Sequence, residues 1–240
     1  MNSLDFFLWV ALPYLCIATF VVGHVWRYRR DQYGWTARST QLLERKLLRL
    51  GSLLFHFGIL AAIGGHVLGI LVPGSWTEAV GISDDNYHRI AVAAGILSGA
   101  AIVAGFAILV YRRARIGRVR ATTTRSDLVL YPVLAATILF GMLATVWGTA
   151  VDRYAYRDTV SVWFRGIFTF HPHEALMANA AFIFQAHAVT AWLLLAIWPF
   201  TRLVHAWSVP VAYLGRPPIL YRARARGAGG ATAGASSVDR

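Results

Sequence analysis

Hydrophobic residues fall into five long runs, and almost all charged residues lie between or beyond them. A helix needs about 20 apolar residues to cross the hydrocarbon layer of a membrane, and each run approaches that length. The pattern therefore predicts an all-α fold, an integral membrane bundle of five transmembrane helices. The predicted spans cover residues 6–26, 53–72, 90–111, 128–150 and 181–203.

Composition and charge support a membrane protein and set its expected orientation. Hydrophobic residues make up 57% of the chain and charged residues only 14%, whereas soluble domains have roughly 25% charged residues. The net charge of +12 does not indicate nucleic-acid binding, because most of the 23 Lys and Arg residues lie in segments 27–49, 112–125 and 202–240. The positive-inside rule assigns these segments to the cytoplasm. We expect a multi-pass protein of a prokaryotic plasma membrane, with its N-terminus outside and its C-terminus in the cytoplasm.

The domain organisation follows from the same pattern. The spans and their loops form one predicted transmembrane domain over residues 1–226, and the Gly-, Ala- and Ser-rich residues 227–240 are typical of a disordered cytoplasmic tail. Residues 160–168, VSVWFRGIF, predict an amphipathic stretch on the outer surface. The single cysteine, Cys16, lies inside an apolar run, so any iron-sulfur relay must belong to a partner.

Four histidines stand at or inside two of the apolar runs, His56 and His66 in the second and His187 and His205 with the fifth. Ionisable residues at membrane depth are costly and usually functional, so the set predicts a buried cofactor. Each one taken singly is better explained as a hydrogen-bonded core residue, and it is the joint pattern that favours a cofactor. His24, beside Trp26 and Arg27 at the end of the first run, fits an interfacial position instead.

Helix geometry predicts which histidines meet. The second and fifth helices run in opposite directions, which brings His66 level with His187 and His56 level with His205. The ten-residue spacing in the second helix rises about 15 Å, but the eighteen-residue spacing in the fifth rises about 27 Å on a straight helix. We expect Pro199 to kink the fifth helix and absorb part of this mismatch.

Paired imidazoles favour one kind of chemistry. Two of them fill both axial positions of a haem iron, which then passes electrons and has no open position for a substrate. Zinc is less favoured, because one pair would leave two of its positions without protein ligands. Nearby, the Gly65-x-x-x-Gly69 motif fits either close helix packing or a slot for a flat cofactor, and the sequence leaves both open.

Several segments together resemble the gamma, or cytochrome b, subunit of membrane-bound respiratory nitrate reductase. The segments are LLFHFGILAAIGGHVLG, RVRATTTRSDL, FIFQAHAV and FTRLVHAWSVPVAYLGRP, and the resemblance covers residues 1 to about 226. It implies two b-type haems, the outer ligated by His66 and His187 and the inner by His56 and His205. It also implies that quinol is oxidised near the outer haem and that electrons pass to an iron-sulfur beta subunit and a molybdenum-containing alpha subunit.

The resemblance is less specific about the quinol site. Family members have lysines at the start of the third helix, where this chain has Tyr87, His88 and Arg89. We therefore predict a quinol site formed by Gly65, Gly69, His66, His88 and Arg89. Arg112 and Arg202, at helix ends close to His205, are predicted to meet haem propionates.

Two alternative functions remain at this point. The chain could be a dihaem, quinol-oxidising subunit of another terminal reductase, such as one that acts on sulfur compounds. It could also be a haem-free structural anchor or small transporter whose histidines only pack. Absorption spectra and the identity of the partner subunits would separate these hypotheses.

Overall fold

The five apolar runs form five helical spans in the computed structural model, which describes residues 2–207. Five helices are long and apolar enough to cross a membrane, and each contains most of its predicted run. The observed spans are Ser3–Arg30, Lys46–Leu71, Asp84–Arg115, Arg125–Val151 and Phe182–Phe200. The predicted fold class is thus confirmed, while the side of the membrane that each end faces remains a prediction. The predicted tail, residues 227–240, lies outside the described residues.

Within these spans the helix type changes several times. The regular helices and their short connecting helices are α1 (Ser3–Phe6), α2 (Leu12–Arg30), α3 (Lys46–His66), α4 (Gly74–Ala79), α5 (Asp84–Arg115), α6 (Gly117–Arg120), α7 (Arg125–Leu143), α8 (Val160–Phe168), α9 (Glu174–Ala178) and α10 (Phe182–Ile197). Three segments are wider, π-helical turns: η1 (Phe7–Ala11), η2 (Val67–Leu71) and η3 (Ala144–Val151). Two are tighter, 3₁₀ turns: η4 (Trp198–Phe200) and η5 (Arg202–Trp207).

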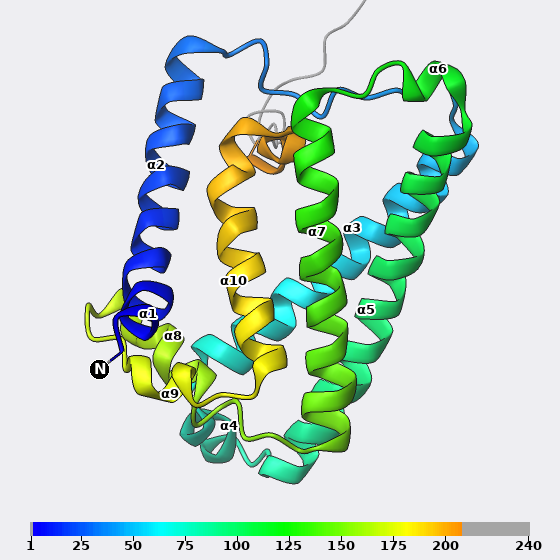
Figure 1. Cartoon of the computed structure of the whole chain (residues 1–240). Helices are drawn as coiled ribbons and strands as arrows, with labels where there is room; N and C mark the ends of the chain where they lie inside the picture. The colour runs from blue at the N-terminus through cyan, green and yellow to red at the C-terminus, as the bar shows by residue number, and fades with distance from the viewer. Residues whose placement is uncertain (1, 208–240) are drawn as a thin grey trace, which may run out of the picture. The chain divides into compact units, whose positions relative to one another are not determined.

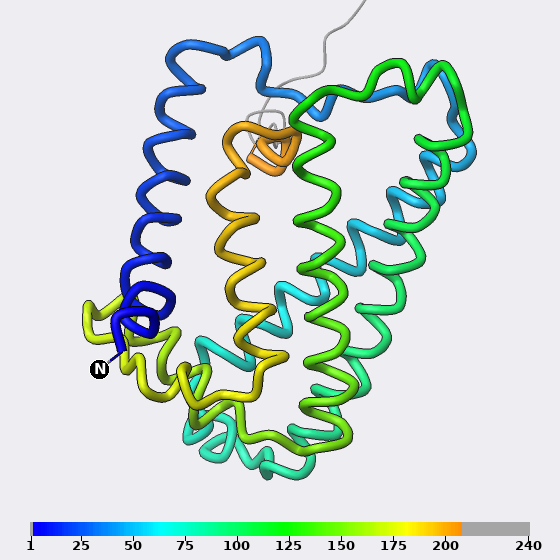
Figure 2. Tube along the Cα trace, in the orientation of Figure 1, coloured from blue at the N-terminus to red at the C-terminus, as the bar shows by residue number. Residues whose placement is uncertain are grey.

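The long helices pack as two groups that cross. α3 lies along α5, whereas α10 packs between α2 and α7, and α3 runs obliquely past α10 (Figures 1 and 2). Glycines allow the close approach of α3 and α5: a Cβ atom on Gly105 would lie 2.5 Å from the backbone nitrogen of Phe55. Small residues at this contact are typical of helix packing in membranes. No comparable packing joins α3 to α10, the two elements from which the paired histidines were expected.

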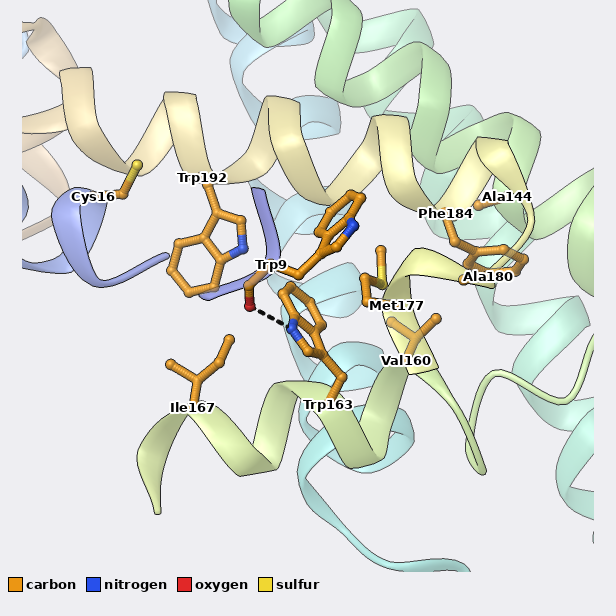
Figure 3. Packing of buried hydrophobic residues seen from close by; sticks show 10 residues of the cluster. All are labelled: Trp9, Cys16, Ala144, Val160, Trp163, Ile167, Met177, Ala180, Phe184 and Trp192. Carbon is orange, nitrogen blue, oxygen red and sulfur yellow. Dashed lines mark hydrogen bonds between the residues drawn. The ribbon is translucent and has the colours of Figure 1, made fainter. Parts of the chain in front are cut away.

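A core of large side chains lies where α8 meets the N-terminal span and α10 (Figure 3). Trp163 of α8 is 1% exposed, and its indole nitrogen donates a 2.8 Å hydrogen bond to the backbone oxygen of Trp9. Ile167 lies one turn further along the same face of α8 and is equally buried. The predicted amphipathic stretch over residues 160–168 therefore forms a helix with one face buried in this core.

The fifth span corrects one prediction. His205 was expected at the inner end of a kinked helix over residues 181–203, but α10 ends at Ile197 and Thr201 is extended, with φ −116° and ψ 180°. Pro199 has no N–H to continue the helix, so the chain turns and His205 lies in the separate turn η5. Because the last span is not one straight helix, the rise of about 27 Å expected between His187 and His205 no longer applies.

A buried arginine stabilises the turn. The guanidinium of Arg27, in the last turn of α2, donates to the backbone oxygens of Pro199 at 2.6 Å and Thr201 at 3.2 Å. Cations suit the free carbonyl groups at a helix end, since these carry partial negative charge. A Cβ on Gly23 would lie 2.8 Å from Pro199, so α2 needs a glycine there to approach the turn.

Candidate functional site

The first histidine pair joins α3 to η5. The Nε2 atoms of His56 and His205 lie 3.5 Å apart, and the two rings are 5.8 Å apart between centroids and inclined at 69°. Nδ1 of His56 is 2.7 Å from the backbone oxygen of Ser52, and Nδ1 of His205 is 2.6 Å from that of Arg202. Each ring thus has one nitrogen toward its own backbone and one toward the other ring.

The second pair joins the end of α3 to α10. The rings of His66 and His187 are 5.9 Å apart between centroids and inclined at 35°. Nδ1 of His66 is 2.7 Å from the backbone oxygen of Ala62 in its own helix. Nδ1 of His187 is 3.1 Å from the backbone oxygen of Thr137, which belongs to the neighbouring helix α7.

These contacts determine which ring nitrogens carry protons. A carbonyl oxygen only accepts hydrogen bonds, so each of the four Nδ1 atoms is the donor, and in the neutral imidazole Nε2 then has a free lone pair. Two lone pairs facing each other at 3.5 Å repel unless a cation lies between them. Hydrogen bonding through the other ring nitrogen is also the usual arrangement of metal-ligating histidines, because it orients the ring and raises its basicity.

The ring centroids of the two pairs, 5.8 and 5.9 Å apart, are close to the spacing of two imidazoles on one metal ion. Imidazole nitrogens bind transition metals at about 2 Å, which puts two opposed nitrogens about 4 Å apart and their ring centroids roughly 6 Å apart. The 3.5 Å between the Nε2 atoms of His56 and His205 is shorter, so these two rings would move apart slightly to hold an ion between them. In the described part of the chain, no group of three or more His, Cys, Asp or Glu residues could hold a metal. The pairs therefore suit an ion whose other ligands come from a cofactor rather than from protein, as haem iron does.

Glycines on two helices shape the surroundings of the His66–His187 pair. A Cβ on Gly64 or Gly65 would meet no protein atom within 4 Å, so this surface of α3 is flat beside His66. A Cβ on Gly141 of α7 would lie 2.9 Å from Cε1 of His187, so only glycine leaves room for that ring. Sequence reasoning missed Gly141 and Thr137; the one signal for Gly141 is that α7 contains no other glycine.

A cleft of about 450 Å³ opens among the segments that connect the spans on the side of the His66–His187 pair. Tyr87, His88, Tyr156 and Arg157 are among its lining residues. The guanidinium of Arg157 lies 3.9 Å from the centre of the Tyr87 ring. Burial, followed by a hydrogen bond to Tyr87, raises the pKa of Tyr156 well above its ordinary value. Sequence reasoning singled out Tyr87 and His88 here but missed Tyr156 and Arg157.

The residues predicted for quinol binding lie in different surroundings. His88 lines the cleft, whereas Arg89 is 74% exposed and pairs with Asp85 at 2.6 Å. Gly69 is buried, and a Cβ there would lie 3.0 Å from the hydroxyl of Tyr156 and 3.1 Å from that of Tyr87. Of the two roles left open for the Gly65–Gly69 motif, Gly69 makes room for side chains, and Gly65 contacts no neighbouring helix. The quinol assignment of all five residues stays a prediction.

Comparison with known proteins places this chain in a protein family. Residues 5–224 match the family model described as the nitrate reductase gamma subunit. The chain belongs to the nitrate reductase gamma subunit family. It is 43% identical to the nitrate reductase gamma chain of Bacillus subtilis over 90% of this chain and 97% of that one. It is 36% identical to the respiratory nitrate reductase 1 gamma chain of Escherichia coli over 93% of this chain and 100% of that one.

A longer relative shares the same region. The chain is 48% identical over 218 residues to the nitrate reductase-like protein NarX of Mycobacterium tuberculosis. That match covers 90% of this chain and 33% of the relative, so the chain spans about a third of its length. The resemblance seen in the sequence motifs is thus confirmed as membership of the gamma subunit family, and the chain is a multi-pass membrane protein.

In this gamma-family chain, the two arginines predicted to meet haem propionates have protein partners. Arg112 pairs with Glu44 at 2.6 Å and also donates to the hydroxyl and backbone oxygen of Thr40. Arg202 pairs with Asp127 at 2.6 Å; burial opposes its charge, but the hydrogen bond to Asp127 raises the pKa of Arg202 above its ordinary value. Contact with a propionate remains a prediction for both.

Proposed function

We propose that the chain is the membrane electron-transfer subunit of a quinol-dependent nitrate reductase. Quinol is oxidised beside the His66–His187 pair, and its electrons leave toward iron-sulfur and molybdenum subunits on the other side of the membrane. Two b-type haems lie between, one held by His66 and His187 and the other by His56 and His205. Membership of the gamma subunit family supports this function, and the names of the two full-length relatives refer to nitrate reductase.

One observation carries the cofactor proposal: four imidazoles that donate through Nδ1 to a backbone oxygen meet as two pairs, with ring centroids 5.8 and 5.9 Å apart. The Nδ1 contact alone is not distinctive, because His24 and His171 make it as well. The pairing is what sets these four histidines apart. A haem held by the two histidines of a pair would supply reversible one-electron transfer. The protein's part is to hold the two rings of each pair in place.

The cleft residues suit a quinol headgroup. Oxidation of a quinol to a quinone releases two electrons and two protons, so a site needs groups that bind hydroxyls and accept protons. The imidazole of His88 can accept a proton at the cleft, and Gly69 keeps the backbone beside His66 close to the hydroxyls of Tyr87 and Tyr156. Arg89 is largely exposed and is linked to the cleft through its ion pair with Asp85, which lines it.

Charge supports the orientation of the assembly. Segments 27–49 and 112–125 carry seven and six Lys or Arg residues and belong in the cytoplasm by the positive-inside rule. The His56–His205 pair lies toward these segments, because Arg202 of the same turn donates to the backbone oxygen of Ala37. Electrons therefore leave on the cytoplasmic side, where the partner subunits dock, and quinol protons are released outside.

Difference spectra of the purified chain test the cofactor proposal. We expect two reducible b-type haems per chain, one lost in His66→Ala or His187→Ala and the other in His56→Ala or His205→Ala. His24→Ala is the matched control: His24 also donates through Nδ1 to the backbone four residues earlier, but its ring meets Phe20, Trp35 and Trp207 and no histidine. It should keep both haems.

Two results would overturn the proposal. Absence of b-type bands in the wild-type chain would refute the cofactor, and loss of a haem in His24→Ala would refute the pairing. Purification of the tagged chain from its native membrane, followed by mass spectrometry, tests the assembly. Partners that include no molybdenum-containing and no iron-sulfur subunit would refute the nitrate reductase assignment.

A further inference from the structure

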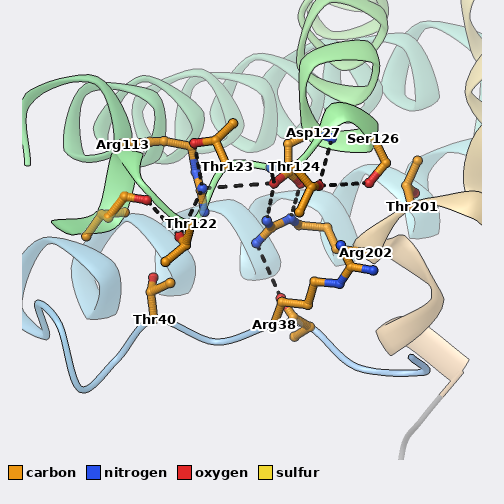
Figure 4. Close-up of polar contacts among 12 residues, drawn as sticks. Arg38, Thr40, Arg113, Thr122, Thr123, Thr124, Ser126, Asp127, Thr201 and Arg202 are labelled. Atoms are coloured by element: carbon orange, nitrogen blue, oxygen red, sulfur yellow. Dashed lines mark hydrogen bonds and ion pairs between the residues drawn. The ribbon is translucent and has the colours of Figure 1, made fainter. Parts of the chain in front are cut away.

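A buried ion pair ties the turn that carries His205 to the start of α7 (Figure 4). The guanidinium of Arg202 binds the carboxylate of Asp127 through two hydrogen bonds, Nε to Oδ1 at 2.7 Å and Nη2 to Oδ2 at 2.6 Å. Asp127 is 1% exposed. A two-point contact of this kind fixes the orientation of the guanidinium as well as its position.

Asp127 is itself held firmly at the first turn of α7. Its Oδ2 accepts a 3.0 Å hydrogen bond from the backbone N–H of Thr124, and the side chain of Thr124 caps the helix in return. The guanidinium of Arg113, from the end of α5, lies 3.9 Å from the same oxygen. The carboxylate is thus a fixed point that belongs to the long helices and not to the turn.

The turn η5 depends on such an anchor. His205 is beyond the end of α10, separated from it by the extended residue Thr201, and 3₁₀ turns have weaker hydrogen-bond geometry than α-helices. The backbone oxygen of Arg202 accepts the Nδ1 proton of His205 at 2.6 Å. Arg202 therefore contacts Asp127 with its side chain and His205 with its backbone.

We propose that Asp127 is a positioning residue for the haem held by His56 and His205, acting through Arg202 to direct Nε2 of His205 toward His56. The inference rests on the proposed function, because it gives the ion pair a role in a haem site. α7 supplies no ligand, yet it orients both ligands from the last span: Thr137 binds Nδ1 of His187, and Asp127 fixes the turn of His205.

Asp127→Asn tests the proposal, because asparagine keeps the shape of the side chain and removes its charge. Outer-shell substitutions weaken metal sites about 10-fold or more, and we expect haem retention at the His56–His205 pair to fall about 10-fold. The haem that remains there should show a shifted ferric EPR signal, which reports the relative orientation of the axial rings. Asp127→Glu keeps the charge and should restore most of the retention.

Glu44→Gln is the matched control. Glu44 also binds a buried arginine at 2.6 Å, but its partners Arg112, Leu47 and Leu48 include no histidine. This variant should keep the wild-type EPR signals of both haems. If Asp127→Asn fails to accumulate, Arg202→Lys keeps the positive charge and loses the two-point contact, and the same shift is expected.

The outcomes separate the two proposals. Wild-type signals from both haems in Asp127→Asn would overturn the positioning role and leave the proposed function intact. Equal shifts of the EPR signal in Asp127→Asn and Glu44→Gln would also overturn it, because the orientation of the axial rings would then not depend on the contact between Asp127 and Arg202. A wild-type chain without haem would instead refute the proposed function.

Discussion

The two histidine pairs differ in what holds the histidine of the last span. His187 lies within α10, donates to the backbone of α7 and fits against Gly141. His205 lies in the turn η5, donates to a backbone oxygen three residues earlier and depends on the Asp127–Arg202 ion pair. The ring of the first is therefore set by helix packing, and the ring of the second by a local turn and by charge.

This difference predicts different sensitivities. A site held by packing responds to changes of volume, since close-packed interiors leave no space for added atoms. A site held by a buried ion pair responds to loss of charge, because the remaining partner is left buried and unpaired. Substitutions of each kind should therefore affect one pair and spare the other.

The largest effect is expected from Gly141→Val. Even the Cβ atom would lie 2.9 Å from Cε1 of His187, and the two further methyl groups leave the imidazole no room. We expect complete loss of the haem at the His66–His187 pair, with the other haem retained in difference spectra. Gly117→Val is the control, because a Cβ there meets no atom within 4 Å. Two haems with unchanged potentials in Gly141→Val would contradict the packing argument.

Arg27→Gln should have the next largest effect and act on the opposite pair. Arg27 is 4% exposed and donates to the backbone oxygens of Pro199 and Thr201, which precede the turn η5. Loss of hydrogen bonds from a buried charged group should lower the free energy of unfolding by about 2–3 kcal/mol. On heating in detergent, the haem at the His56–His205 pair should be released first.

The control for this variant is Arg29→Gln, two residues away on the exposed surface of α2. It should melt like the wild-type chain. If the haem of the His66–His187 pair is released first in Arg27→Gln, the turn does not depend on Arg27 in the way its contacts indicate.

The fold could be predicted from sequence because membrane spans are a property of composition. Each needs a long apolar run, and the chain has five. The meeting of His66 with His187 also follows from the opposite directions of two helices. The meeting of His56 with His205 was predicted from the same two helices, but in the structure it depends on the turn after Pro199. Ligation of iron by these residues stays a prediction.

The contacts that support the histidines could not be predicted from sequence, because many of them are made to backbone carbonyl oxygens, which every residue has. The backbone oxygen of Thr137 is chemically like any other, and only the packing of α7 on α10 makes it the acceptor for His187. The break follows from Pro199, but the side chain that stabilises it, Arg27, lies 174 residues before Thr201 in the chain. Thr124 and Asp127 cap the start of α7 together, and the carboxylate of Asp127 also binds an arginine 75 residues away.

A smaller effect is expected from Ser161→Ala. The buried hydroxyl of Ser161 in α8 shares its proton between the backbone oxygen of Gly69 at 3.0 Å, in the π-helical segment after His66, and that of Tyr156 at 3.1 Å. Loss of one neutral hydrogen bond should lower the free energy of unfolding by about 1 kcal/mol, and thermal melting should show it. Ser98→Ala is the control for a buried serine that binds only its own helix. Equal melting of both variants would mean that α8 does not support the segment after His66.

The smallest effect at neutral pH is expected from Tyr156→Phe, beside the His66–His187 pair, and it should grow only at high pH. The pKa of Tyr156 is raised, so below about pH 10, the ordinary value for tyrosine, the hydroxyl is neutral in the folded and unfolded states alike. Above that pH the unfolded chain loses the proton and the folded chain keeps it, so stability falls as pH rises. The melting temperature should fall less steeply between about pH 8 and about pH 11 in Tyr156→Phe than in the wild type.

The control is Tyr33→Phe, at a fully exposed tyrosine, whose melting temperature should fall with pH as it does in the wild type. Parallel declines in all three chains would mean that the hydroxyl of Tyr156 is not buried against Gly69 and Tyr87, and the surroundings of the two histidine pairs would then differ less than their contacts indicate.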